Sequence, residues 1–140
     1  MSISAVRQYF QTAMDELGYL EWKDGFNFED VPENIVNKLY HITTGTVVGN
    51  SQNQTALDIT YPVLLQVYFH GYRYPVDAID ESLTSGQEIL CRLVNPANAN
   101  GEVIKDVQFI SMEPLPKDAA TNDNIVLLQM NFEVRLFLQF

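Results

Sequence analysis

Apolar and polar residues alternate along the last sixteen residues of the chain, 125–140, and this pattern predicts a long β-strand. The apolar positions that would share one face are Met130, Phe132, Val134, Leu136, Leu138 and Phe140. The other face would carry Gln129, Asn131, Glu133, Arg135 and Gln139. Because successive side chains of a strand point to opposite faces, we expect one buried face and one wetter face. Such a two-sided strand is typical of an antiparallel sheet.

Two stretches repeat apolar residues every three or four positions and are predicted to be helices. The first covers residues 3–17, and Gly18 is expected to end it in the left-handed conformation. The second runs from about Val76 to Val94, with Asp77 as the expected N-cap. Its predicted buried stripe is Ile79, Leu83, Gly86, Leu90 and Leu93. Gly86 is expected to allow close packing on the sheet, since glycine is otherwise unfavourable inside a helix.

Three further strands are predicted from β-branched and aromatic residues. Two of them, within residues 33–48 and 55–69, flank a polar run at 49–54 that is expected to be the loop of a long antiparallel hairpin. Pro62 predicts an edge position or a bulge in the second of these strands. The third strand is expected at 103–112, followed by a long loop at 113–124.

The order of these elements predicts an α+β fold. We expect an antiparallel sheet of strands of mixed length, with two helices packed on one face, in a single domain spanning residues 1–140. Residues 19–32, rich in aromatic and acidic residues, leave the position of any strand open.

The net charge of the chain is -10, from 18 acidic against 8 basic residues. This balance argues against gripping nucleic acid through its phosphates, which requires Lys and Arg. No apolar run is long enough to span a membrane, and the N-terminus is not expected to be a signal peptide. The single cysteine, Cys91, cannot form an internal disulfide, which favours a reducing compartment.

Candidate catalytic residues are few. His41 and His70 fall in or at the end of predicted strands without metal-ligand spacing, so we expect strand histidines at a surface or an interface. Cys91 is expected to be a small buried thiol, with a Cys–His nucleophile as the alternative. We predict no catalytic residue, no cofactor and no metal site.

Two short clusters could be taken for binding sites. Asp77, Asp80 and Glu81 could bind a metal, but acids are common in the first turns of a helix, where they favour the helix dipole. The sequence Tyr72-Arg73-Tyr74 interleaves a base with aromatic residues, as single-strand binding proteins do. With one Arg in so acidic a chain, packing or interface use is the favoured interpretation.

The order and shape of the predicted elements resemble the tail terminator proteins of long-tailed bacteriophages, small ring-forming proteins that cap the tail tube and meet the head. The segments that carry the resemblance are V-R-Q-Y-F-Q-T-A-M-D-E-L-G, the hairpin as far as Y-P-V-L-L-Q-V-Y-F, S-L-T-S-G-Q-E-I-L-C-R-L and N-F-E-V-R-L-F. The resemblance implies an α+β subunit of a hexameric ring in the virion tail or neck, assembled in the host cytoplasm. Its implied partners are itself, the tail tube protein and a head-completion or connector protein. DNA would pass through the ring without specific binding, and no catalysis is implied.

Two groups of residues are candidates for such a role. Those expected to contact a neighbouring subunit or the tube are Gly49, Asn50, Gln52, Asn53, Tyr72, Arg73, Tyr74, Arg135, Phe137 and Phe140. Those expected to line the channel, where acids would repel phosphate, are Asp58, Glu102, Asp106, Asp118 and Asp123.

Two alternatives remain open from the sequence. The chain could be a head–tail adaptor or a minor tail protein of the neck, since these share the size and the order of elements. It could also be a small-molecule-binding or enzymatic α+β domain. That alternative predicts a monomer or dimer with a deep apolar pocket holding His70 or Cys91.

Overall fold

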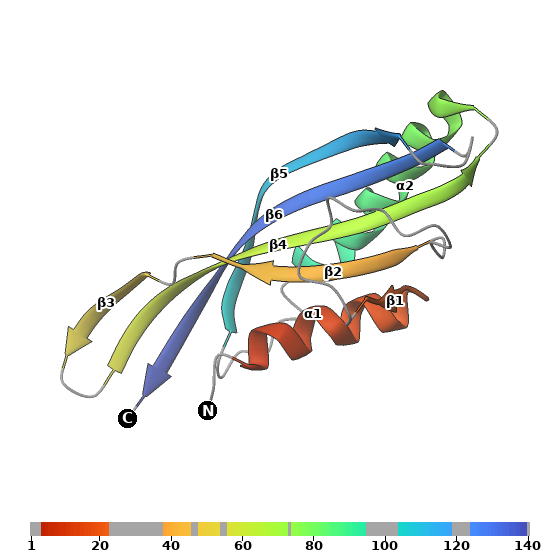
Figure 1. Ribbon diagram of the computed structural model, residues 1–140. Coiled ribbons are helices and arrows are strands. Elements are labelled where there is room, and N and C mark those ends of the chain that lie inside the picture. Colours follow the sequence, from red (N-terminus) through yellow and green to blue (C-terminus); the bar gives the residue numbers. More distant parts are fainter. Residues whose placement is uncertain are drawn as a thin grey trace.

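The computed structural model describes residues 4–22, 38–45, 48–53, 56–72, 74–94, 104–118 and 124–139. Over these residues the chain forms two helices and a six-stranded mixed sheet (Figure 1), which confirms the predicted α+β fold. The elements are α1 (Ser4–Glu16), β1 (Leu20–Glu21), β2 (Leu39–Thr44), β3 (Val48–Asn53), β4 (Ala56–Tyr72), α2 (Pro75–Val94), β5 (Ile104–Asp118) and β6 (Asn124–Gln139).

The two longest strands, β4 and β6, form the centre of the sheet. The strand order is β1-β2-β4-β6-β5, and β3 pairs with β4 beyond the end of β2. The short β1 lies parallel to β2, and the other described pairs are antiparallel. The predicted C-terminal strand is therefore confirmed as β6, held between β4 and β5.

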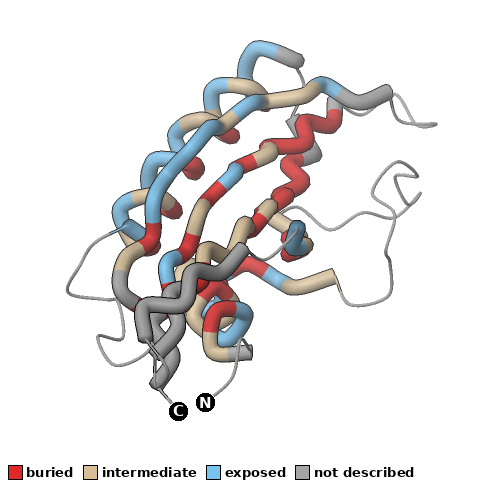
Figure 2. The backbone as a smooth tube through the Cα atoms, turned by 90° about the vertical axis from the view of Figure 1, so that its left-hand side faces the viewer, coloured by how far each residue is buried: buried red, intermediate tan, exposed pale blue. Residues whose placement is uncertain are grey.

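Both helices pack on the same face of the sheet. The rings of Phe10 on α1 and Phe132 on β6 lie 5.4 Å apart, and α2 approaches Leu128 on that same face. Figure 2 shows the buried residues of α2 on the side of the helix that faces the sheet. The predicted apolar face of β6 is confirmed where side chains are described, because Met130, Phe132, Val134 and Leu136 are fully or almost fully buried.

The α1 helix forms where the apolar periodicity predicts it. The residues of its stripe that are fully buried are Val6, Phe10, Ala13 and Met14. Gly18 follows the helix with φ of 87°, so the predicted left-handed ending is confirmed.

The α2 helix is rotated relative to the predicted stripe. Its buried residues are Ala78, Ser82, Ser85, Gly86, Ile89 and Leu93, whereas Ile79, Leu83 and Leu90 are only partly buried. The small residues let the helix approach the sheet closely, and the Ser82 hydroxyl is satisfied by the Ile79 carbonyl at 2.7 Å. Asp77 is the third helical residue, so its predicted role as N-cap is wrong.

The predicted loop at residues 49–54 is wrong for residues 49–53, which belong to β3. The real interruption lies between β2 and β3, opposite Pro62, whose carbonyl accepts a hydrogen bond from the Gly45 amide at 3.3 Å. The nitrogen and carbonyl of a strand residue point the same way, so the nitrogen of Pro62 faces this interruption and not β6. The predicted edge position is wrong, because β4 is an inner strand. The alternative of a bulge is not contradicted, because three residues separate Thr44 from Val48 where two separate their β4 partners Val63 and Thr60.

The β5 strand is longer than predicted and continues through residues 113–118, where the sequence indicated a loop. Pro114 and Pro116 are tolerated because β5 is an edge strand, and both nitrogens face away from β6. The register shifts at Ile104/Asp106 and at Phe109/Ser111, so this edge is also interrupted by two irregularities.

The sheet extends beyond the helices at one end. We call this extension the arm, and it consists of β3, residues 56–59 of β4 and residues 137–139 of β6. In Figure 1 the arm lies at the lower left, past the ends of both helices. Neither described helix is long and apolar enough to cross a membrane.

Candidate functional site

The arm holds most of the residues predicted to contact other subunits. Gly49, Asn50, Gln52 and Asn53 all belong to β3. Asn50 pairs with Asp58 of β4, and Asp58 pairs on its other side with Phe137 of β6. Three predicted residues from distant parts of the sequence therefore form one row across the arm.

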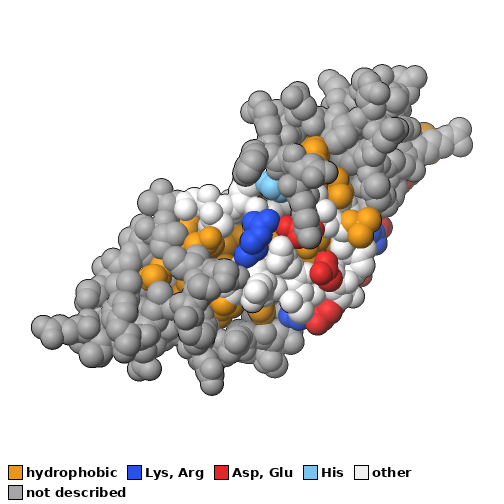
Figure 3. Space-filling model, turned by 60° about the horizontal axis from the view of Figure 1, so that its bottom comes forward, with side chains coloured by type: hydrophobic (Ala, Val, Ile, Leu, Met, Phe, Trp, Pro, Cys, Tyr) orange, Lys and Arg blue, Asp and Glu red, His pale blue; other side chains and the backbone are white. Residues whose placement is uncertain are grey.

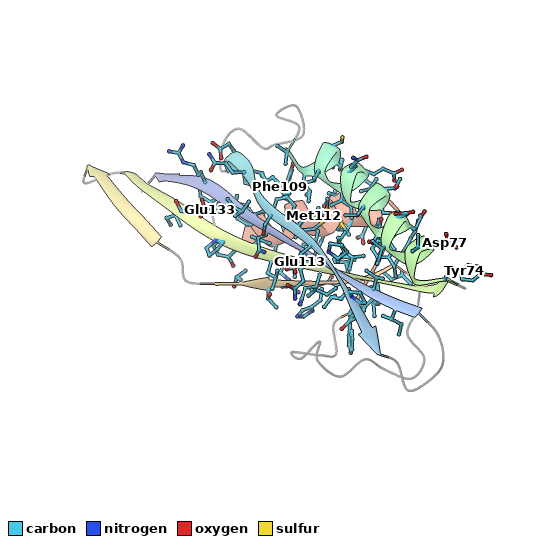
Figure 4. All side chains as sticks on the ribbon, turned by 90° about the horizontal axis from the view of Figure 1, so that it is seen from above. Tyr74, Asp77, Phe109, Met112, Glu113 and Glu133 are labelled. Carbon is cyan, nitrogen blue, oxygen red and sulfur yellow. The ribbon has the colours of Figure 1, made fainter. Side chains whose placement is uncertain are left out.

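Arg135 of β6 pairs with Thr60 next to the arm, and the other described candidates lie at the opposite end of β4. Tyr72 is the last residue of β4, and Tyr74 directly precedes α2 with 55% of its surface exposed. Figure 4 shows Tyr74 beside Asp77 at the start of α2, far from Phe109 and Glu133. The predicted contact residues thus form two separate groups, the arm and this β4–α2 corner. Arg73 and Phe140 lie outside the described residues.

The acids predicted to line a channel are not gathered in one place. Asp58 lies in the arm and Asp118 at the far end of β5. Asp106 forms an ion pair of 3.8 Å with Arg135, a predicted contact residue, and both side chains are close to half exposed. Such an exposed pair contributes little stability, but it offsets the charge of Asp106. Glu102 and Asp123 lie outside the described residues.

The sequence analysis did not recognise the acidic outer face of the helices as a surface. Its members are Asp15, Glu16, Asp77, Asp80, Glu81 and Glu88. Arg92 lies among them and binds Glu16 at 2.8 Å, which lowers the pKa of Glu16 through the hydrogen bond. The spacing of these acids opposite the apolar stripes could have identified this surface.

The histidine and cysteine candidates are not brought together. His41 is buried on β2, with Nδ1 3.2 Å from the Trp22 carbonyl oxygen. Cys91 is exposed on α2, so the prediction of a buried thiol is wrong. The side chain of His70 is outside the described part of the chain. Among the described residues, no group of three His, Cys, Asp or Glu is placed to hold a metal ion.

A cleft of about 690 Å³ lies between α1 and the outer edge of β2. The helix contributes Val6, Arg7 and Gln11 to its lining. The strands contribute Glu21, Trp22, His41, Ile42, Thr43, Thr44, Tyr61 and Val63. The cleft therefore combines an apolar floor with a small group of polar side chains beside a strand edge.

The charges in this cleft neutralise one another. The Glu21 carboxylate, whose side chain is only 8% exposed, accepts hydrogen bonds from Arg7 and Gln11, both at 2.8 Å. Arg7 also approaches the Ile42 carbonyl oxygen at 3.4 Å. Figure 3, which views the α1 side, shows acidic and basic side chains beside one another.

A tyrosine hydroxyl behind the cleft is held in its neutral form. Tyr40 is buried and its hydroxyl donates to Asp15 at 3.5 Å. Burial raises the pKa of Tyr40, and the nearby carboxylates of Glu21 and Asp15 raise this pKa further. A hydroxyl held neutral in this way is not suited to proton transfer near neutral pH.

No protein-family model matches the chain, and no curated protein matches it. The functional assignment therefore depends on the fold, the surfaces and the predicted resemblance.

Proposed function

We propose that this chain is a structural virion protein that caps the end of a long phage tail tube as a hexameric ring and provides the attachment site for the head. The observation that carries the proposal is the separation of the predicted contact residues into the arm and the β4–α2 corner. A ring subunit must contact both its neighbours and the tail tube, and this chain offers separate surfaces for these contacts at opposite ends of one long strand, the arm for a neighbouring subunit and the β4–α2 corner for the tube.

The form of the arm supports the same function. An exposed strand edge tends to pair with other chains, so proteins that act as monomers usually block such edges. No described strand pairs with the outer edge of β3, and neither helix lies over the arm in Figure 1. Assembly into a ring would cover this edge.

The distribution of acids fits the passage of DNA. With a net charge of -10, the chain as a whole repels phosphate. We assign the channel lining to acids of the helix surface, together with Asp58 of the arm. A ring map with lysines and arginines around the channel would contradict this assignment.

Electron microscopy of the purified protein tests the proposal directly. We expect rings of six subunits, or caps at the ends of tail tubes when tubes are added, and a matching mass in solution. Tubes whose ends are already occupied are the control, because they should bind no additional protein. A protein that stays monomeric at every concentration and ignores tube ends would contradict the proposal.

The same experiment separates the terminator from a head–tail adaptor. An adaptor would bind the connector or head-completion protein and leave the tube end open. A terminator must bind the tube end first and then present a surface to the head.

A small-molecule-binding domain is the second candidate, and the cleft beside α1 favours it. Its volume of about 690 Å³ lies within the range usual for ligand sites, roughly 300–1,000 Å³. A thermal-shift screen of metabolites tests this candidate. A hit that is lost on Thr44→Trp, which would narrow the cleft from its exposed rim, would support a pocket over a ring.

A further inference from the structure

Beyond the short β1, none of the described strands pairs with the outer edge of β2. The Trp22 amide donates to the Tyr40 carbonyl at 2.7 Å, so Tyr40 directs its backbone groups away from β4. By the alternation of strands, Ile42 and Thr44 direct theirs to the same side. No described strand occupies that side of Ile42 and Thr44, and their one described contact there is the long hydrogen bond from Arg7 to Ile42.

This open edge borders the cleft described above. The helix α1 runs along one side of the cleft and the edge of β2 along the other, with the partly buried Tyr61 contributing apolar surface. A groove between a helix and a sheet edge is a common site for strand addition, in which a guest strand bonds to the edge and its side chains enter the groove. Arg7 is held at the side of the groove by Glu21, so it need not leave its ion pair when a strand enters.

The other long edge of the sheet is closed to such pairing. Pro114 and Pro116 remove two outward donors from β5, and the shifts in register break the regular spacing of the rest. Strand addition at β5 is therefore disfavoured, whereas β2 itself has neither a proline nor a shift in register between Ile42 and Thr44.

The arm offers a strand that matches the groove. The outer edge of β3 has no partner among the described strands, and Gly49 and Ser51 direct their backbone groups outward. The strand reads V-G-N-S-Q-N and has no charged residue, in a chain whose net charge makes most surfaces of two copies repel each other. The groove is itself close to neutral, because Arg7 and Glu21 are paired.

We propose that β3 of one copy adds to the edge of β2 in the next copy, in the groove beside α1. This inference rests on the proposed ring function and specifies the contact between its subunits. Each copy then donates one strand and accepts one, which is the head-to-tail contact that a closed ring requires.

Disulfide trapping tests the pairing. In a Cys91→Ser background, one variant carries Thr44→Cys and its partners carry cysteine at position 49, 50 or 51 in turn, so that three successive registers at the middle of β3 are sampled. Within one copy these sites cannot join. Position 44 pairs with Val63, and positions 49 to 51 pair with Ile59 to Leu57, four to six residues away along β4, or about 13–20 Å. A disulfide requires Cα atoms within about 7 Å. We expect a mixture of the two variants to give a cross-linked dimer that neither gives alone.

Proline substitution provides an independent readout. Ser51→Pro removes an outward amide of β3 without touching its bonds to β4, and Ser51→Ala is the matched control. We expect the proline variant to self-associate about tenfold more weakly or worse, and the alanine variant to be unchanged. Circular dichroism establishes that both variants are folded.

The outcomes separate this contact from the ring itself. Rings that form but never cross-link between positions 44 and 49–51 would overturn the β2–β3 contact without contradicting the proposed ring. Cross-linking of the Thr44→Cys variant with itself would indicate a two-fold contact and would also overturn the proposal. A monomer under all conditions would overturn both the contact and the ring.

Discussion

Gly86 of α2 lies so close to Met112 of β5 that a Cβ atom added to the glycine would be 2.5 Å from the methionine sulfur. The same atom would be 3.2 Å from Cδ2 of Leu128. Figure 4 shows Met112 on β5, between Phe109 and Glu113 along the strand. The absence of a side chain at position 86 thus sets the distance between α2 and the sheet.

Gly86→Ala is expected to destabilise the protein. Overpacking typically costs about 1–3 kcal/mol. This cost outweighs the gain in helix propensity, which is at most about 1 kcal/mol. Urea unfolding measures the net change. In a Met112→Ala background the cost of Gly86→Ala should be smaller, because the nearest atom is gone. If Gly86→Ala in the parent background is at least as stable as the parent, Met112 and Leu128 move aside without cost.

Leu136→Asp is expected to prevent folding. Leu136 is fully buried on the helix-facing side of β6, where a carboxylate would have no partner. Asn131→Asp is the control, because Asn131 is exposed on the opposite face of the same strand. We expect the far-ultraviolet circular dichroism of the first variant to be that of an unfolded chain and that of the control to be native. A native spectrum from Leu136→Asp would show that the assignment of the two faces of β6 is wrong.

Tyr9→Phe is expected to weaken the contact between the two helices. The Tyr9 hydroxyl donates to the Leu93 carbonyl at 2.6 Å, and its loss should cost about 0.5–1.5 kcal/mol. Glu16→Gln, which removes the exposed ion pair with Arg92, should have no measurable effect. Thermal unfolding of both variants measures which one is less stable. If Glu16→Gln lowers the stability more than Tyr9→Phe, the prediction is wrong.

Stability is expected to fall above pH 10. Burial raises the pKa of Tyr68 above its ordinary value of 10.0, so the unfolded chain loses this proton first as the pH rises. The stabilisation from neutral Tyr68 is complete below pH 10 and decreases above it, by up to about 1.4 kcal/mol per pH unit. Urea midpoints at several pH values should decline more gently for Tyr68→Phe than for the parent. Equal slopes would mean that the hydroxyl reaches water when ionised.

The sequence predicted those elements in which apolar residues recur with a clear period. The alternation in β6 and the apolar stripe of α1 identified both elements and their buried faces. The span of α2 was also predicted, but its buried face was predicted only in part. Gly86 and Leu93 were predicted correctly, but hydrophobicity favoured Ile79 and Leu83 whereas packing selected Ser82 and Ser85.

Other features depend on neighbours that no local pattern reveals. Pro114 and Pro116 indicate a loop unless the strand is known to be at an edge. One side of the cleft could have been inferred from the sequence, since Arg7 and Gln11 are four residues apart on α1 and must share a face. Their partner Glu21 comes from beyond the chain reversal at Gly18, which the periodicity cannot place.

The break opposite Pro62 affects which insertions and deletions this fold can tolerate. Within a paired strand, one inserted residue turns every later side chain to the wrong face. Because β2 and β3 are registered on β4 independently, on either side of Pro62, a residue gained or lost at positions 45–47 leaves both registers intact. The arm can therefore change its length and sequence while the core beneath α1 and α2 stays as it is.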